Sequence, residues 1–408
     1  MPLTKIQFAP GVNKEGTEYT ADAGWFDSDK VRFRKGRPEK IGGWAKYSSS
    51  TFLGVCRSLH DWASLESIRY IGVGTHLKFY VNQGASYHDV TPIRSTTSAG
   101  DVTFAATNGS STITATDTAH GANVNDFVTF SDAASLGGNV TAAVLNQEYQ
   151  VASVPTANTF TFVAKDTSGT TVTANASDSG NGGSSTVGAY QIGVGLNAYV
   201  EGTGWGAGAW GDGTFGSVSS LSASSQLRLY SQDNFGEDLV FNVRAGGVYY
   251  WDESSGTSNR AVALSALSGA SNTPTAALQV MVSDVDQHVI CFGANPIGSS
   301  NIDPLFVRWS DQESAADWTP TATNTAGGSR INSGSTIVGA VQSRQEILIF
   351  TDASLHSMRF VGSPFIFQFS TLSTDISMIS PNAAVNARGV VYFMDKGNFY
   401  TYNGAVQP

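Results

Sequence analysis

The pattern of apolar and polar residues along the chain is that of a protein built from β-strands. Short apolar segments are each followed by a tight turn and then by a second segment rich in aromatic residues, whereas helical periodicity is hard to find. Five such hairpin units stand out: RYIGVGTHLKFYV from Arg69, LVFNVRAGGVYYW from Leu239, VICFGANPIGSSNIDPLFVRW from Val289, ILIFTDASLHSMRF from Ile347 and VVYFMDKGNFYTY from Val390. The pattern therefore predicts an all-β fold.

The spacing of these units predicts how they are arranged. The last four begin at intervals of 50, 58 and 43 residues. Such spacing is typical of β-propeller blades, in which each small sheet covers the apolar face of the next. We interpret residues 1–97 as an N-terminal arm with the first blade or blades, and residues 188–408 as the remaining blades of a propeller-like core. An ordinary sandwich with irregular hairpins is the alternative. No closing blade is evident after the last unit, so either the C-terminus is truncated or the remainder of the propeller is a separate segment.

A segment with a different sequence pattern separates the first hairpin unit from the second. Between Asp101 and Ser177, alternating segments follow one another at the close spacing of a β-sandwich. These segments are STITATDT, DFVTFSD, EYQVASV, TFTFVAK and TTVTANA. The run SDSGNGGSS comes next and has the composition of a flexible joint. We expect residues 98–187 to form an immunoglobulin-like β-sandwich inserted into a loop of a blade.

A glycine-rich stretch, GTGWGAGAWGDGTFG at Gly202–Gly216, follows the expected insertion. It places Trp205, Trp210 and Phe215 at steps of five. Glycine at this density excludes a regular helix and allows close backbone approach. One interpretation is an aromatic loop that contacts a ligand or lines a pore. The simpler interpretation is a flap whose aromatic side chains hold it against the adjacent sheet.

Charge is scarce in the chain and unevenly distributed. Only 14% of residues are charged and the formal net charge is −10, yet the stretch GWFDSDKVRFRKGRPEKIGGW, from Gly24 to Trp44, gathers six cations. They are Lys30, Arg32, Arg34, Lys35, Arg37 and Lys40. In a strand, Val31 and Phe33 would point to one side and the alternating cations to the other. We expect the cations to form one ridge.

This ridge has three interpretations. It can dock onto an acidic neighbouring subunit, contact a phosphate backbone, or be a solvated face neutralised by nearby carboxylates. Those carboxylates are Asp22, Asp27, Asp29 and Glu39. The apolar side of the strand is expected to be sealed by Trp25, Phe26, Phe33 and Trp44, and the segment around Pro38 is expected to be a turn. Because four carboxylates lie so near, docking onto a protein is favoured over contact with DNA.

Sequence signatures of catalysis are missing. The chain has no G-x-S-x-G, H-E-x-x-H or G-x-x-x-x-G-K-[ST] motif, and its six histidines never pair at metal-ligand spacing. The carboxylate pairs Asp27/Asp29 and Asp284/Asp286 could support acid–base chemistry, but surface turns and ion pairs give the same pattern. The sequence predicts no enzymatic activity, no catalytic or metal-binding residues and no cofactor.

The cysteines, the apolar runs and the N-terminal residues indicate the cellular compartment in which the chain folds. Cys56 and Cys291 are far apart and are expected to be buried thiols rather than a disulfide. No apolar run is long enough to cross a membrane, so membrane insertion is not expected. The N-terminal residues lack the apolar region of a secretory signal peptide.

Three segments resemble a family of tailed-bacteriophage structural proteins. They are FAPGVNKEGTEYTADAGWFDSDKVRFRKGRPEKIGGW from Phe8, FVRWSDQESAADWTPTATNTAGG from Phe306 and GAVQSRQEILIFTDASLHSMRFVGSPFIFQF from Gly339. More distantly, the chain resembles the tail hub, or nozzle, of short-tailed phages, also called the packaged-DNA stabilisation protein. This resemblance implies a propeller-based subunit of a homo-hexameric ring below the portal and adaptor, with a central channel for DNA and no enzymatic activity.

The function expected from pattern and resemblance together is structural. The chain would be a virion protein of a phage tail, assembled in the bacterial cytoplasm, that retains packaged DNA and conducts it without sequence specificity during ejection. The alternative is that the inserted sandwich or the glycine-rich stretch Gly202–Gly216 recognises host-surface glycans. A propeller enzyme acting on glycans is a weaker one, since it also needs carboxylates clustered in one cleft.

Overall fold

The computed structural model of the chain describes residues 9–20, 24–177, 181–198 and 227–408. Within these residues the regular structure is almost entirely strand, with one short α-helix, α1 (Ala142–Leu145), and a few single-turn 3-10 helices. The prediction of an all-β fold is confirmed. The chain divides into two compact units, Met1–Ser49 and Ser50–Pro408, which are described separately.

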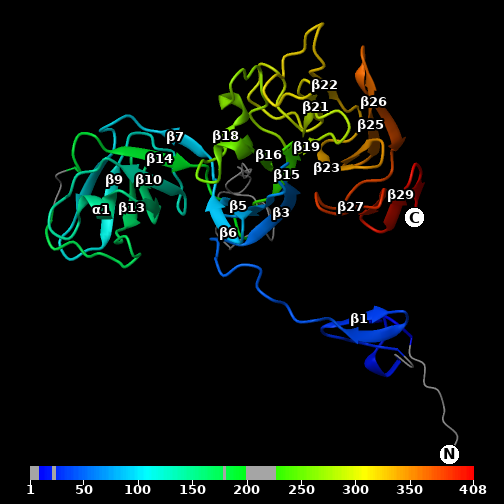
Figure 1. The fold of residues 1–408 in the computed structure, drawn as a ribbon, viewed down its shortest axis with the longest axis horizontal. Helices are drawn as coiled ribbons and strands as arrows, with labels where there is room; N and C mark the ends of the chain where they lie inside the picture. Colours follow the sequence, from blue (N-terminus) through cyan, green and yellow to red (C-terminus); the bar gives the residue numbers. More distant parts are fainter. Residues whose placement is uncertain (1–8, 21–23, 178–180, 199–226) are drawn as a thin grey trace, which may run out of the picture. The chain divides into compact units, whose positions relative to one another are not determined.

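The N-terminal unit contains a two-stranded antiparallel hairpin. Strand β1 (Val31–Arg34) pairs with β2 (Arg37–Lys40), as Figure 1 shows. The two residues between the strands, Lys35 and Gly36, have φ values of 50° and 76°. Positive φ at both positions is what a two-residue type I′ turn requires, and the twist of this turn matches that of the strands it joins.

Five four-stranded antiparallel sheets account for most of the second unit, and in each the strands pair in chain order (Figure 1). The first sheet contains β3 (Cys56–Ala63), β4 (Arg69–Thr75), β5 (Phe79–Gln83) and β6 (Ser86–Asp89), and the second contains β15 (Tyr230–Phe235), β16 (Asp238–Val243), β17 (Val248–Trp251) and β18 (Val262–Ala263). The third contains β19 (Gln279–Val282), β20 (Val289–Phe292), β21 (Phe306–Trp309) and β22 (Gly327–Arg330). The fourth contains β23 (Ile337–Gln342), β24 (Ile347–Thr351), β25 (Leu355–Gly362) and β26 (Ile366–Ser373), and the fifth β27 (Ala384–Ala387), β28 (Val390–Met394), β29 (Phe399–Tyr402) and β30 (Val406–Gln407). Each hairpin predicted from the sequence forms the two central strands of one sheet.

Successive sheets pack against each other through alternating side chains of their central strands. In β20, Val289 and Cys291 share a core with the second sheet, whereas Ile290 and Phe292 share a core with the fourth. Because neighbouring side chains of a strand point to opposite faces, both faces of the third sheet are buried. Similar cores join the first sheet to the second and the fourth to the fifth. Such packing is what the expected β-propeller requires; the propeller itself stays a prediction.

The first two sheets lie close together at two glycines of β4. A Cβ atom added at Gly72 would lie 2.2 Å from Oε1 of Gln232, and one added at Gly74 would lie 2.6 Å from the ring of Tyr230. The amide of Gln232 ends a flexible side chain and could move away, but the ring of Tyr230 is buried. β15 can therefore lie this near to β4 only because Gly74 carries no Cβ.

The region between the first and second sheets along the chain contains two further four-stranded sheets that enclose one core. One has the order β11-β10-β14-β7 and the other β12-β13-β9-β8. The strands are β7 (Ile93–Thr96), β8 (Thr103–Ala106), β9 (Thr112–Thr116), β10 (Phe127–Ser131), β11 (Glu148–Gln150), β12 (Ser153–Thr156), β13 (Thr159–Val163) and β14 (Val187–Gln191). Phe104, Phe130, Phe160 and Phe162 fill the core between them. The immunoglobulin-like class and the limits 98–187 stay predictions.

Two details of the predicted strands in this region are wrong. EYQVASV is not one strand but two, because the chain crosses from the sheet of β10 to the sheet of β13 between Gln150 and Ser153. TTVTANA forms only an isolated bridge, between Thr171 and Lys165. The carboxylate of Asp166 accepts backbone N–H groups of Ser168 and Thr170 at 2.9 Å, and this local turn competes with extended pairing.

Candidate functional site

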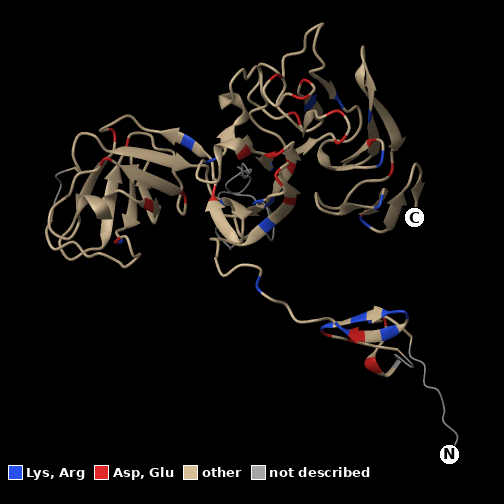
Figure 2. Ribbon diagram, viewed as in Figure 1, with Lys and Arg blue, Asp and Glu red and all other residues tan. Residues whose placement is uncertain are grey.

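The hairpin of the N-terminal unit divides its cations between two faces. Figure 2 shows Lys and Arg in blue on the hairpin, with Asp or Glu in red beside them. Strand pairing sets Arg32 opposite Glu39 and Arg34 opposite Arg37, so the three arginines share one face. Lys40 pairs with Val31 on the other face, and Lys35 lies in the turn. The prediction of a single ridge is therefore wrong for Lys40, since residues paired across antiparallel strands share a face. Lys30 lies directly before β1, with φ 56°.

Nearby carboxylates neutralise only part of this charge. The ion pairs are Lys14–Asp27 at 3.2 Å, Lys30–Asp29 at 3.4 Å and Arg32–Glu39 at 3.2 Å. The hydrogen bond from Lys14 lowers the pKa of Asp27. In the described part of the chain, Arg34, Lys35, Arg37 and Lys40 form no ion pair with a carboxylate. Asp22 lies outside the described residues. Arg34 and Arg37 are thus like charges placed opposite each other, an unfavourable pairing unless a partner supplies acid.

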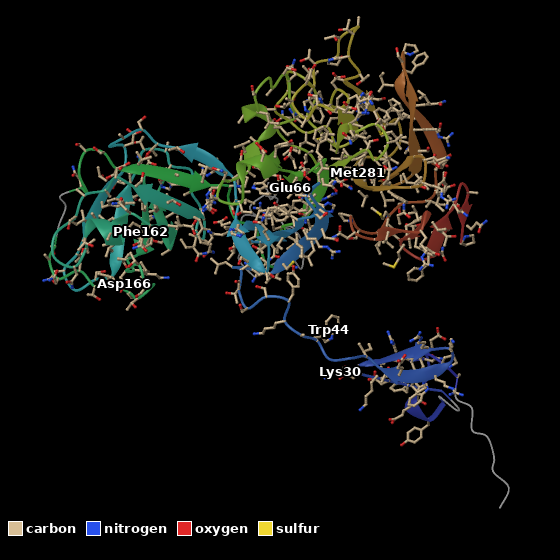
Figure 3. All side chains as sticks on the ribbon, in the orientation of Figure 1. Lys30, Trp44, Glu66, Phe162, Asp166 and Met281 are labelled. Carbon is tan, nitrogen blue, oxygen red and sulfur yellow. The ribbon has the colours of Figure 1, made fainter. Side chains whose placement is uncertain are left out.

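The aromatic side chains around the hairpin only partly match the prediction. The ring of Trp25 packs on that of Phe33, with centroids 6.1 Å apart. Trp44 is 94% exposed, so the prediction that it seals the apolar side is wrong (Figure 3). The turn predicted around Pro38 is also wrong, because Pro38 lies inside β2 opposite Phe33. In a hairpin closed by a two-residue turn this is a non-hydrogen-bonded position, so the missing N–H of proline costs no strand bond. Trp205, Trp210 and Phe215 lie outside the described residues.

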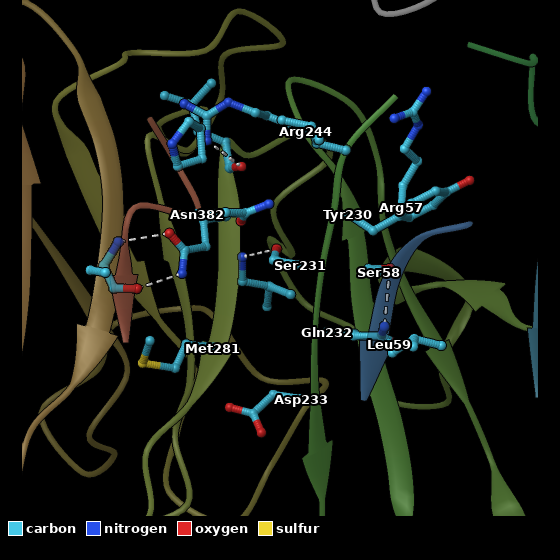
Figure 4. Close-up of a pocket in the computed structure, with 17 residues that line it drawn as sticks. Arg57, Ser58, Leu59, Tyr230, Ser231, Gln232, Asp233, Arg244, Met281 and Asn382 are labelled. Carbon is cyan, nitrogen blue, oxygen red and sulfur yellow. Dashed lines mark hydrogen bonds between the residues drawn. The ribbon is translucent and has the colours of Figure 1, made fainter. Parts of the chain in front are cut away.

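A second candidate site is a pocket of about 400 Å³ to which every one of the five successive sheets contributes (Figure 4). Its walls come chiefly from the first strand of each sheet: β3, β15, β19, β23 and β27. The polar side chains in the lining are Arg57, Ser58, Ser231, Gln232, Asp233, Arg244, Gln279 and Asn382. None of these residues was predicted from the sequence to belong to a site. A sequence feature that could have indicated the pocket is a polar strand that precedes an apolar hairpin, as YSQDNF stands before LVFNV.

Positively and negatively charged side chains lie at different ends of this pocket. Figure 4 shows Arg57 and Arg244 at one end and Asp233 toward the other. Asp233 accepts backbone N–H groups of Val282 at 2.9 Å and Asn234 at 3.0 Å, and burial raises the pKa of its carboxyl group. The guanidinium of Arg244 donates to the carbonyl oxygens of Leu278 and Ile337 at 3.3 and 3.5 Å, and burial lowers its pKa.

One arrangement has the order of a catalytic triad. Nδ1 of His288 lies 2.6 Å from a carboxylate oxygen of Asp286, and its Nε2 lies 3.0 Å from the hydroxyl of Thr325. His288 is completely buried and Asp286 nearly so. A substrate cannot reach the imidazole, and Thr325 already bonds to Asp311, so these contacts hold the third sheet together. Asp286 therefore belongs to the interior rather than to a surface turn.

Other chemistry is limited in the part of the chain that the structure describes. No three side chains of the metal-binding types gather there. Cys56 and Cys291 are free, as predicted; Cys56 is half-buried, and burial of Cys291 raises its thiol pKa to about 12. None of the described helices is long and apolar enough to cross a membrane.

Comparisons with known proteins give little to add. No family model matches the chain, and no curated protein matches it. Among solved structures, the endosialidase of phage phi92 is similar at 12% sequence identity and a TM-score of 0.29. The match covers 88% of this chain and 55% of that one, so the chain spans about half the length of the endosialidase. This TM-score is too low to support an argument about function.

Proposed function

We propose that the chain is a structural protein of a phage tail, and within the tail a hub or nozzle subunit. In this proposal six copies form a ring below the portal and adaptor, and the ring retains packaged DNA and conducts it at infection without catalysing a reaction. The resemblance of the three segments supports the tail assignment. The succession of four-stranded sheets is compatible with the propeller that this resemblance implies.

The arginine face of the N-terminal hairpin carries the proposal that the chain docks onto another protein. Arg34 and Arg37 lie opposite each other without a carboxylate among the described residues, so an acidic surface would relieve their repulsion. Glu39 shares this face through its pair with Arg32. A carboxylate in the contact surface repels phosphate but suits a protein partner of mixed charge. An acidic region of a neighbouring tail subunit therefore fits better than DNA.

Replacing Arg34 and Arg37 together with serine is expected to reduce incorporation into tails while the chain still folds. Both side chains are exposed, and surface substitutions usually change the free energy of unfolding by about 0.5 kcal/mol or less. An exposed ion pair contributes about 0–1 kcal/mol, but a ring repeats the contact in every copy. Assembly is measured by the amount of this chain in purified tails, and association in vitro should weaken as salt increases.

Lys14→Ser is the matched control, because Lys14 is exposed in the same unit but already paired with Asp27. It should assemble normally. Normal assembly of the Arg34/Arg37 double variant, with packaged DNA retained, would contradict the docking role. Normal tails that lose their genome would instead identify DNA as the partner of this face.

A further inference from the structure

We propose that the pocket lined by the first strands binds a small anion, a molecule carrying a phosphate or carboxylate group, through Arg57 and Arg244. This inference concerns the second unit and does not depend on the tail assignment or on the N-terminal hairpin. It rests on the charge, hydrogen bonding and size of the pocket.

Among the described residues, the side chains of these two half-buried arginines donate only to main-chain carbonyl oxygens. Arg57 donates from one terminal nitrogen to the carbonyl of Asn197, while its Nε is buried and has no hydrogen-bond partner in the described structure. Arg244 contacts only carbonyl oxygens, at 3.3 and 3.5 Å. No carboxylate among the described residues forms an ion pair with either side chain. Positive charge that is partly withdrawn from water and has no counter-charge is unfavourable, and an anion would supply charge-assisted hydrogen bonds.

Further positive charge lies near this end of the pocket. Arg228, next to the lining residue Leu229, is buried, donates to the carbonyl of Gly193 at 2.6 Å and has its guanidinium carbon 5.9 Å from the ring of Tyr230. These arginines also act on His76. Burial is the largest cause that lowers the pKa of its imidazole, and the positive charges of Arg57 and Arg228 lower it further.

The opposite end of the pocket orients the ligand. Asp233 lies there, and its oxygens already accept two backbone N–H groups. An anionic group would be repelled from this carboxylate and would lie at the arginine end. A pocket of about 400 Å³ holds a small molecule, whereas a DNA duplex is far larger, so nucleic acid is not the ligand of this site.

Isothermal titration calorimetry and thermal unfolding of the full chain test the proposal, with inorganic phosphate and with citrate at constant ionic strength against chloride. Saturable binding and a rise in Tm that grows with ligand concentration are expected for at least one of the two anions. The anion that binds identifies phosphate or carboxylate as the group recognised. Arg57→Gln and Arg244→Gln should each weaken binding about tenfold or more, because each removes charge-assisted hydrogen bonds.

Two further variants keep the test decisive if a pocket arginine is needed for folding. Asp233→Asn removes the negative charge from the lining and should tighten binding several-fold. Arg359→Gln removes an exposed arginine that is paired with Glu346 at 3.5 Å, and it should bind like the parent chain. Absence of saturable binding for both anions would overturn the proposal. Equal affinity in the parent, Arg57→Gln and Asp233→Asn chains would also overturn it, because the anion would then bind elsewhere.

Discussion

Replacing Lys78 with methionine is expected to lower the free energy of unfolding by about 3–5 kcal/mol. Lys78 is only 3% exposed, and its ammonium group contacts Asp89 at 2.7 Å and also Glu148. Arg260 approaches the same two carboxylates at 3.2 and 3.4 Å. Without the lysine, two half-buried carboxylates would share one half-buried arginine, and the charge left uncompensated would disfavour the folded state.

Equilibrium unfolding by urea measures this loss, and Lys14→Met provides the matched control. The Lys14–Asp27 pair has a similar length, but both of its side chains are mostly exposed. Removing such a pair should change stability by no more than about 1 kcal/mol. A loss of less than about 1 kcal/mol for Lys78→Met would show that the buried network contributes no more than a surface pair.

Acid should weaken the same network. Burial on its own would raise the pKa of Asp89, but the charges of Lys78 and Arg260 and hydrogen bonds from Lys78 and Thr91 outweigh it, so the pKa lies below its ordinary value of 3.8. A carboxyl group with a lowered folded-state pKa contributes stability that is complete above the unfolded-state pKa and is lost as pH falls through the folded-state value. The parent chain should therefore lose stability below about pH 4, and Lys78→Met should lose less over that range.

The hairpins were predictable from the sequence because everything that forms them is local. Four of the predicted units span 13 or 14 residues and the one from Val289 spans 21, and all five are present. The first strand of each sheet was harder to recognise, since its residues face a polar pocket on one side. Tyr230–Phe235, with the sequence YSQDNF, has the polarity of a loop, and its role becomes visible only where the first strands of the five sheets converge on the pocket.

The candidate sites could likewise be predicted only as far as they depend on residues close together in the sequence. The cations of the hairpin could be found by counting, but their faces depend on the register set by the turn at Lys35 and Gly36. Lys78, within the turn THLK, has the sequence context of an ordinary surface lysine. One of its acidic partners, Glu148 in β11, lies 70 residues away along the chain. A pair of this kind depends on tertiary contacts that no local pattern encodes.

The second large effect is expected for Phe241→Ala, which should cost about 3–5 kcal/mol of unfolding free energy. Phe241 of β16 is completely buried and stacks on Phe79 of β5, with ring centroids 3.8 Å apart and an angle of 5° between the planes. This stack joins the first sheet to the second within one core. Truncation removes the apolar contact between the rings and leaves a cavity. The two sheets already lie close together at Gly72 and Gly74, so they cannot easily move closer to fill it.

Phe399→Ala is the control that separates packing between sheets from the loss of any phenylalanine. Phe399 lies in β29 of the fifth sheet and is 76% exposed, so its truncation should change stability by no more than about 0.5 kcal/mol. Both variants are compared with the parent by urea unfolding, and a double variant with Phe79→Ala tests whether the two rings act as a pair. Strongly non-additive losses are expected for residues in direct contact. Additive losses, or equal losses for Phe241→Ala and Phe399→Ala, would mean that the first and second sheets do not pack through this stack.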